Sequence, residues 1–248
     1  MKGLIVGVAN EQSLAWGCGK ALHAQGAEIA LTYLNDKAKP YIAPLAAEIG
    51  APIFMPLNVQ KPEELDALFA AIVKQWGRLD FLIHSIAFAP KADLERGLLD
   101  ASLEGFLTAM DISCHSLLRL TRAAVPLMPD GGAVLCMSYY GAEKVIDNYN
   151  LMGPVKAALE SSVRYLAAEL GPKSIRVNAL SPGPVKTRAA SGLAHFDALM
   201  EKAAREAPLH QLVSIDQVGE AAAFLCSDKA RFITGQTIFV DGGFNIKA

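Results

Sequence analysis

Tyr149 and Lys156, with six residues between them, carry side chains that could together serve a reduction. A phenol can donate a hydrogen bond to an oxygen on which negative charge develops, and an ammonium can hold sugar hydroxyls. If the segment is helical, the step between the two residues turns through about 700°, so both side chains would point the same way. This spacing also arises by chance in many helices, so its meaning depends on the elements that position the pair.

Short runs of strand-forming residues alternate with longer helical patterns along the whole chain. Strands are predicted at 4–8, 28–33, 53–59, 81–85, 132–138, 175–180 and 237–240, and helices at 62–76, 103–127, 152–170 and 215–227. Such alternation is typical of a parallel sheet covered on both faces. The sequence therefore predicts an α/β fold: one doubly wound Rossmann domain, residues 1–248, with a seven-stranded parallel sheet. Pro52 and Pro56 place the third strand at an edge of this sheet.

Composition and charge narrow the class of protein. The chain has 248 residues, 52% hydrophobic and 19% charged, enough for a full globular core. Its net charge of −2 lacks the basic excess of a nucleic-acid binder, and no apolar run reaches the length of a membrane span. No signal peptide is recognisable, and the cysteines form no C-x-x-C pair. We expect a cytoplasmic protein without metal, disulfide, nucleic-acid partner or membrane contact. The cysteines are Cys18, Cys114, Cys136 and Cys226.

The first predicted strand runs into a turn that contains several glycines, G-V-A-N-E-Q-S-L-A-W-G-C-G at 7–19. Such a turn between a first strand and a first helix can place backbone N–H groups against a pyrophosphate. Gly7 and Gly17 are too far apart for the G-x-G-x-x-G pattern. The hydroxyl of Ser13 could also donate to phosphate. The alternative is an ordinary loop between a strand and a helix.

The ends of later strands indicate the rest of a dinucleotide site. Many NAD sites carry an acidic residue after the second strand, but this chain has Leu34 there. Lys37 and Lys39 follow, and they are more typical of a solvated helix start than of a clamp for the phosphate of NADP. Residues 57–59 could contact adenine, and the backbone at 84–87 should line the nicotinamide side. His84 could be catalytic, although a core histidine is the simpler interpretation.

Long stretches of the chain resemble the short-chain dehydrogenase/reductase superfamily and, more narrowly, the bacterial enoyl-acyl-carrier-protein reductases. The superfamily is marked by R-V-N-A-L-S-P-G at 176–183 and by T-G-Q-T-I-F-V-D-G-G at 234–243. The narrower family is marked by H-S-I-A-F-A-P at 84–90 and by the Tyr-x6-Lys block within 138–160. The resemblance covers essentially the whole chain.

The resemblance implies roles for individual residues. Tyr149 would hydrogen-bond the substrate oxygen, Lys156 would hold the nicotinamide ribose, and Tyr139 would lie near the substrate carbonyl, with Ala89 also in the substrate pocket. The cofactor would contact Gly7, Ser13, Leu14, Leu34, Asn58, Val59, Ser85, Ile86, Lys156, Val185 and Thr187. Leu34 replaces a polar residue, commonly Gln, of the family's NADH users, and Asn58 replaces a common Asp.

The implied reaction is reduction of the trans-2 double bond of an enoyl-acyl-carrier-protein thioester, the last step of fatty acid elongation. NADH is expected as the cofactor and NADPH less so. An acyl carrier protein is the expected partner, and helices 103–127 and 152–170 suggest a homotetramer by analogy. Residues 181–207 are expected to form a substrate lid with a locally basic surface. That surface would comprise Lys186, Arg188, Lys202 and Arg205.

Two alternatives remain open. A carbonyl reductase or alcohol dehydrogenase of the same superfamily would use Tyr-x3-Lys with an assisting serine, and Tyr140 and Lys144 have that spacing. This pair comes directly after a predicted strand and has Gly141 within it, so we expect a loop there. The nearest serine, Ser138, is only two residues before Tyr140. The second alternative is a nucleotide-binding paralogue without turnover.

Overall fold

The computed structural model describes residues 1–187 and 196–247. Within these ranges one parallel sheet has the strand order β3-β2-β1-β4-β5-β6-β7. The strands are β1 Lys2–Val6, β2 Glu28–Tyr33, β3 Ile53–Pro56, β4 Phe81–His84, β5 Gly132–Met137, β6 Ile175–Pro182 and β7 Thr237–Val240. The predicted fold class is confirmed, and the strand bounded by two prolines lies at an edge as expected.

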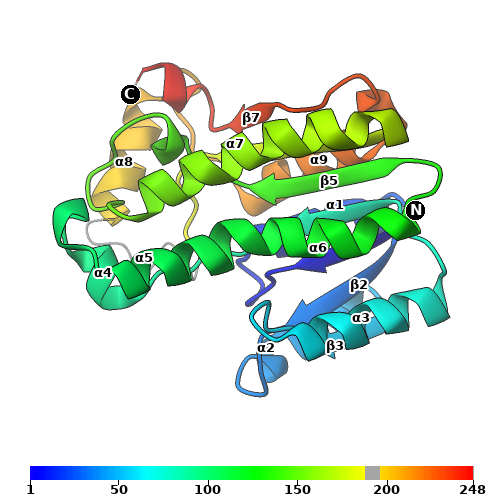
Figure 1. Cartoon of the computed structure of the whole chain (residues 1–248). Helices are drawn as coiled ribbons and strands as arrows, with labels where there is room; N and C mark the ends of the chain where they lie inside the picture. Colours follow the sequence, from blue (N-terminus) through cyan, green and yellow to red (C-terminus); the bar gives the residue numbers. More distant parts are fainter. Residues whose placement is uncertain (188–195, 248) are drawn as a thin grey trace.

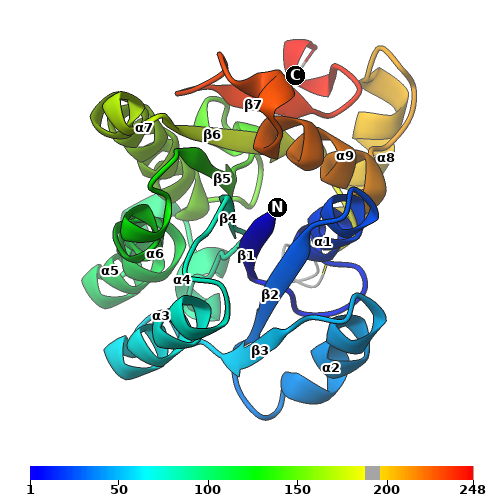
Figure 2. The same cartoon turned by 90° about the vertical axis from the view of Figure 1, so that its right-hand side faces the viewer.

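Helices cover both faces of the sheet (Figures 1 and 2). They are α1 Leu14–Ala24, α2 Lys39–Glu48, α3 Pro62–Gln75, α4 Lys91–Glu95, α5 Leu103–Met110, α6 Ser116–Ala124, α7 Met152–Leu170, α8 Phe196–Glu206 and α9 Ile215–Cys226. One buried apolar cluster joins the sheet to α3, α6 and α7, and a second joins it to α1, α2 and α9. Among the described helices, none combines the length and hydropathy that a membrane span needs.

Several predicted strand limits were wrong by one to three residues, and pairing explains the differences. The first strand begins at Lys2 and ends at Val6, because Gly7 takes φ +103° and leaves the extended conformation. The third ends at Pro56, which pairs with Tyr33, the last residue of its only sheet neighbour among the described strands. The sixth continues to Pro182, because β7 pairs with it that far.

The helix predicted at 103–127 is interrupted. A π-helical turn, Asp111–His115, separates α5 from α6, and a 3₁₀ turn, Val125–Leu127, ends the segment. Ser116, the first residue of α6, donates its hydroxyl proton to the carbonyl of Ile112 in this turn at 2.6 Å. Such turns often occur at functional sites, and this one lies beside the carboxyl end of β4.

The strand order changes direction between β1 and β4, which makes the crevice at their carboxyl ends the expected ligand site. Gly7 lies at this point, where a Cβ atom would come within 2.0 Å of the carbonyl oxygen of Ser85. A side chain at position 7 would therefore fill the space between the two strand ends. Figure 1 shows α4 and α8 at the same end of the sheet, toward which the arrowhead of β5 points.

Candidate active site

A cavity of roughly 920 Å³ opens at the carboxyl ends of the strands, near the upper end of the usual range for ligand pockets. It is lined by the turn after β1, the ends of β2 to β6, α4, the start of α7 and Phe196 of α8. Every site residue predicted from the sequence lines this one cavity. They are Gly7, Ser13, Leu14, Leu34, Asn58, Val59, Ser85, Ile86, Ala89, Tyr139, Tyr149, Lys156, Val185 and Thr187.

The turn after β1 is organised by Ser13. Its Oγ accepts hydrogen bonds from the backbone N–H groups of Ala9 and Asn10, both at 3.0 Å, and donates to Oδ1 of Asn10 at 3.3 Å. A phosphate would therefore compete with Oδ1 of Asn10 for the single hydroxyl proton of Ser13. Leu14 begins α1 without a side-chain cap. The N–H groups of Trp16 and Gly17 donate to the carbonyl of Ser13, which leaves those of Leu14 and Ala15 as anion donors.

The end of the cavity at Leu34 and Asn58, where adenosine is expected, offers little to a phosphate. Leu34 follows β2 with 56% of its surface exposed, and it lines the cavity. Lys39 turns back over the ring of Tyr33, with its Nζ 5.4 Å from the ring centroid. Asn58 is held by its backbone N–H, which donates to Glu64 at 2.6 Å, while its Oδ1 accepts from the N–H of Gln60 at 3.0 Å.

Tyr149 is not helical, so the predicted helical spacing to Lys156 does not apply. The helix α7 begins at Met152, and Tyr149 lies in the preceding turn, where its N–H donates to the carbonyl of Ile146 at 3.1 Å. Its neighbours Asn148 and Asn150 have φ of 63° and 40°, in the left-handed region that asparagine tolerates better than most residues. The two left-handed residues turn the chain so that the phenol still lines the cavity with Lys156.

The two phenols of the cavity lie together. The rings of Tyr149 and Tyr139 meet edge to face, with centroids 5.0 Å apart. At Gly141 a Cβ would come within 2.6 Å of the Tyr149 ring, so only glycine leaves room for it. Burial raises the pKa of Tyr149, which is 9% exposed, and burial followed by contact with Tyr140 raises the pKa of Tyr139. Both phenols are therefore neutral donors near pH 7.

The hydroxyl of Tyr139 is buried. The hydroxyl of Tyr140 is close enough to influence it, but neither Tyr140 nor any other described residue meets it with the geometry of a hydrogen bond. A buried, unpaired donor is costly unless a ligand or water completes it. Because Tyr139 lines the cavity beside Tyr149, an acceptor oxygen bound there would satisfy it.

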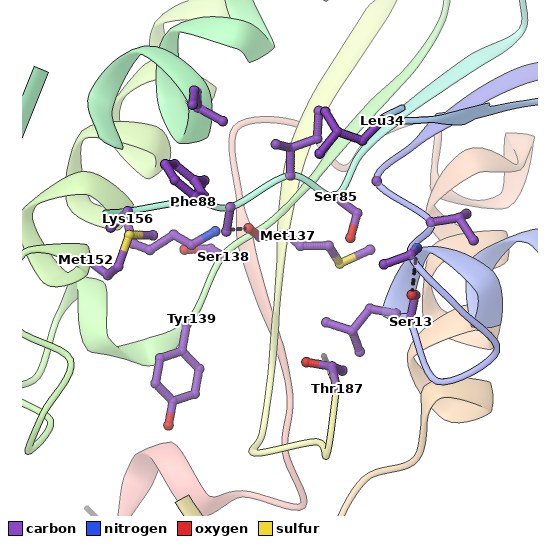
Figure 3. A pocket seen from close by; sticks show the side chains of 18 of the residues that line it. Ser13, Leu34, Ser85, Phe88, Met137, Ser138, Tyr139, Met152, Lys156 and Thr187 are labelled. Carbon is purple, nitrogen blue, oxygen red and sulfur yellow. Dashed lines mark hydrogen bonds between the residues drawn. The ribbon is translucent and has the colours of Figure 1, made fainter. Parts of the chain in front are cut away.

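Lys156 is only 4% exposed and donates from Nζ to the carbonyl oxygen of Met137 at 2.6 Å (Figure 3). Burial lowers the pKa of Lys156, and nearby Cys136 and Glu160 partly oppose this shift. Ser138 also lines the cavity, but its hydroxyl donates to Oε1 of Glu160 at 2.5 Å. That proton is not available to a substrate oxygen.

The competing pair, Tyr140 and Lys144, does not line the cavity. Tyr140 is buried against Phe244, with ring centroids 5.4 Å apart, and Lys144 is exposed. The segment lies in the connection between β5 and α7, as expected, and contains a short 3₁₀ turn, Tyr140–Ala142. With the hydroxyl of Ser138 directed at Glu160, a Ser-Tyr-x3-Lys site is not formed.

The sequence did not reveal the support beneath the loop after β4. His84 is completely buried, and its Nε2 lies 2.7 Å from Oγ of Ser116, whose proton goes to Ile112, so Nε2 is the donor. Burial, and then the charge of Lys156, lowers the pKa of His84 to about 3. Ser113, in the π-helical turn, accepts from the N–H of Phe88 at 2.8 Å and donates to its carbonyl at 2.9 Å.

Sequence reasoning also missed the apolar wall of the cavity, which comes from helices rather than from strand ends. No local signal in the sequence marks these side chains, because their periodicity is that of any packed helix face. They are Leu94, Ile112 and Met152, with Thr108 beside them, whereas Phe196 belongs to the segment 181–207 that was expected to cover the substrate. Met137 and Ser138 could have been found, since they end β5 beside the strands already assigned to the site.

Fold and site together define a dinucleotide-binding reductase of the short-chain dehydrogenase/reductase type, with a Tyr-x6-Lys pair. The family model described as Enoyl-(Acyl carrier protein) reductase matches residues 7–245. The chain belongs to the enoyl-acyl-carrier-protein reductase family.

Individual relatives are similar over nearly their full length. The enoyl-acyl-carrier-protein reductase (NADH) 1 of Rhizobium meliloti is 47% identical over 98% of this chain and 90% of its own. The Anaplasma phagocytophilum reductase, solved in complex with NAD, is 48% identical with a TM-score of 0.95, over 99% of this chain and 94% of its own. The Bacillus cereus reductase, solved with NADP+ and an indole naphthyridinone, is 40% identical with a TM-score of 0.97. The match covers 100% of this chain and 97% of its own.

Proposed function

We propose that the protein reduces the trans-2 double bond of enoyl-acyl-carrier-protein thioesters with NADH, the last step of fatty acid elongation. The observation that carries this proposal is the placement of Tyr149, Tyr139 and Lys156 around the cavity that also holds the turn at Gly7. The relatives at 43–47% identity are NADH-dependent reductases of this kind, which supports the same activity here.

The residues present fit a dinucleotide. Gly7 leaves the close approach at the strand switch point open, and the uncapped start of α1 can face a pyrophosphate. Lys156 would hold the nicotinamide ribose with the donors that its bond to Met137 leaves free. When bound, NADH supplies a hydride to the β-carbon of the substrate.

Tyr149 would act on the other end of the conjugated system. As the β-carbon is reduced, negative charge develops on the thioester oxygen, and a neutral phenol can donate a hydrogen bond to it. The unpaired hydroxyl of Tyr139 would supply a second donor or orient the carbonyl. The α-carbon is then protonated, so the product gains one hydride and one proton. The apolar wall at Leu94, Met152 and Phe196 would exclude water and contact the acyl chain.

Other parts of the proposal concern the surroundings of the site. We propose that the described ends of 181–207 border the acyl chain as part of a lid, since Val185, Thr187 and Phe196 line the cavity. Residues 188–195 of the predicted lid, which include Arg188, lie outside the described residues. A cytoplasmic location fits the four buried, free cysteines.

We also propose a homotetramer that uses α6 and α7. These helices border a shallow surface groove lined by small residues, Ala158, Ser161 and Ser162, beside Tyr165, which is 78% exposed. An acyl carrier protein would deliver the substrate on the side of α4 and α8, whose residues Leu94 and Phe196 line the cavity. Figure 1 shows the two helices at the same end of the sheet.

One assay tests the central proposal. Purified protein with crotonyl thioester should oxidise NADH, followed by the loss of NADH absorbance, while a 3-ketoacyl thioester should give no loss above background. Preferential use of the ketoacyl substrate would identify a carbonyl reductase instead. Tight NADH binding without turnover of either substrate would identify a nucleotide-binding protein.

A further inference from the structure

The turn that carries Tyr149 is joined to α4 by a side chain of the next residue. Nδ2 of Asn150 donates to the carbonyl oxygen of Leu94 at 2.8 Å, a contact between residues 56 positions apart. Leu94 lies in the short helix Lys91–Glu95, and it lines the cavity together with Tyr149. One hydrogen bond thus connects the element that aims the phenol with an apolar wall of the pocket.

Asn150 satisfies two requirements at once. Its φ of 40° is left-handed, and its carbonyl accepts from the N–H of Gly153 at 3.0 Å, at the start of α7. Asparagine occupies this conformation at lower cost than most residues. Asn148, two residues earlier, has a φ of 63°, but its side chain is exposed and forms no hydrogen bond to the described residues. The two asparagines therefore share a backbone role, and only Asn150 adds the bond to α4.

The helix α4 needs such external support. It has five residues, too few for a stable isolated helix, and it lacks a side-chain cap at its start. Near its centre the carboxylate of Asp93 accepts from the N–H of Ser102 at 2.7 Å, which ties it to the start of α5. The bond from Asn150 ties the next residue, Leu94, to the turn before α7. Without it, the packing of Leu94 against the core and the bond from Ser102 to Asp93 remain to hold the wall.

We infer that Asn150 is a positioning residue that sets the spacing between the phenol of Tyr149 and the wall at Leu94, and thereby the preference for acyl chain length. The inference rests on the proposed reduction of enoyl thioesters. A short substrate reaches the phenol and the nicotinamide side without needing this wall. A long acyl chain depends on it, so loss of the bond weakens binding of long substrates selectively.

Two substitutions remove the donor while keeping a residue that accepts a left-handed φ. Asn150→Gly removes the side chain, and Asn150→Asp keeps its shape but replaces the N–H donor with an acceptor. Asn148→Gly and Asn148→Asp are the matched controls, with the same backbone demand and no bond to α4. All four are compared with wild type for NADH affinity, and for kcat and KM with crotonyl and trans-2-dodecenoyl thioesters.

Both Asn150 variants should raise KM for the dodecenoyl substrate by roughly 3–10-fold, the range for loss of one ordinary hydrogen bond. Their KM for crotonyl thioester and their affinity for NADH should stay within about 2-fold of wild type, because the bond is lost at the wall of Leu94, which neither ligand is proposed to need. Equal losses for both substrates, or equal losses in the Asn148 variants, would overturn the inference. If Asn150→Gly does not fold, Asn150→Asp alone decides. A wild type that reduces neither thioester would instead overturn the proposed function.

Discussion

Lys156 donates a 2.6 Å hydrogen bond to the carbonyl oxygen of Met137, the last residue of β5. The ammonium is therefore fixed by the backbone of the central sheet rather than by an acidic side chain. Because a Lys ammonium has three N–H donors, the bond to Met137 leaves others for a ligand. The position of the charge is preset before a cofactor arrives, which lowers the cost of ordering it.

Replacing Lys156 with methionine should separate binding from stability. Lys156→Met should raise the Kd for NADH by about 10–100-fold, the usual cost of losing a hydrogen bond to a charged group. The melting temperature of the cofactor-free protein should not fall, because burial already lowers the pKa of this lysine and an apolar side chain of similar length avoids that desolvation. NADH titration and thermal melts measure the two effects. Unchanged NADH affinity would remove Lys156 from the cofactor site.

Replacing Tyr149 with phenylalanine should affect turnover rather than cofactor binding. Tyr149→Phe should lower kcat by about 10²–10³, as for loss of one donor to a developing oxyanion, and by less if Tyr139 compensates. Tyr140→Phe is the matched control, because that phenol packs against Phe244 outside the cavity. Steady-state kinetics with crotonyl thioester compare the two. The opposite ranking would make Tyr140 and Lys144 the active pair.

The order of elements and most of the site could be predicted from sequence, because parallel strands collect their carboxyl ends at one edge. Gly7 and Ser85 follow strands directly and Asn58 lies two residues past the end of β3, so topology alone brings them together. The conformation of Tyr149 could not be predicted in this way. It depends on two asparagines with positive φ and on the space left by Gly141, which are tertiary effects without a periodic signal.

The interior contacts around His84 were equally hidden. A histidine at the end of a buried strand is compatible with catalysis or with the core, and only the partner decides. Here the partner is Ser116, which follows a π-helical turn that helical periodicity does not announce. The sequence therefore located His84 correctly beside the site but could not assign its role in holding the loop at 85–90.

His84 should make folding stability depend on pH. Burial lowers its pKa to about 3 in the folded protein, whereas an unfolded histidine titrates near about 6.5. Between these two pKa values only the unfolded state binds the proton. The contribution of neutral His84 to the free energy of unfolding is therefore complete above about pH 6.5. It falls by at most about 1.4 kcal/mol per pH unit as the pH drops toward 3.

Urea unfolding at about pH 7, 6 and 5 measures how the free energy of unfolding changes as His84 becomes protonated in the unfolded state. His84→Gln keeps a terminal N–H that can donate to Ser116 but does not titrate, so its stability should fall less over the same range. Other groups titrate in both proteins, and the difference between the two slopes isolates His84. Parallel pH profiles for wild type and His84→Gln would show that the histidine is not buried in its neutral form.

The cofactor preference should follow from Leu34. With an apolar side chain after β2 and Lys39 placed over Tyr33, the described residues offer little to a 2′-phosphate, so kcat/KM should be higher with NADH than with NADPH. Leu34→Arg should improve use of NADPH by roughly 10-fold or more, since Arg binds phosphate with charge-assisted bonds. Lys37→Ala is the control. A wild-type preference for NADPH that disappears in Lys37→Ala would make Lys37 the phosphate ligand.

Docking of an acyl carrier protein was expected to use a locally basic surface in 181–207. The described part weakens that expectation, because each cation there pairs with a carboxylate. Lys202 and Arg205 both contact Glu206, at 3.9 and 2.9 Å, and Lys186 contacts Asp197 at 3.7 Å. Arg188 lies outside the described residues. Exposed pairs of this kind are worth little, however, so an acidic partner could exchange with Glu206.

If docking is electrostatic, raising salt should lower kcat/KM for a carrier-bound enoyl substrate and leave that for crotonyl thioester nearly flat, because exposed charges are screened beyond about 8–10 Å near physiological salt. Glu206→Gln should raise kcat/KM for the carrier-bound substrate at low salt, since it frees both Lys202 and Arg205. Reversing those two cations to glutamate should lower it. Neither change should affect the small substrate. Parallel salt curves for the two substrates, together with silent variants, would place the docking surface away from α8.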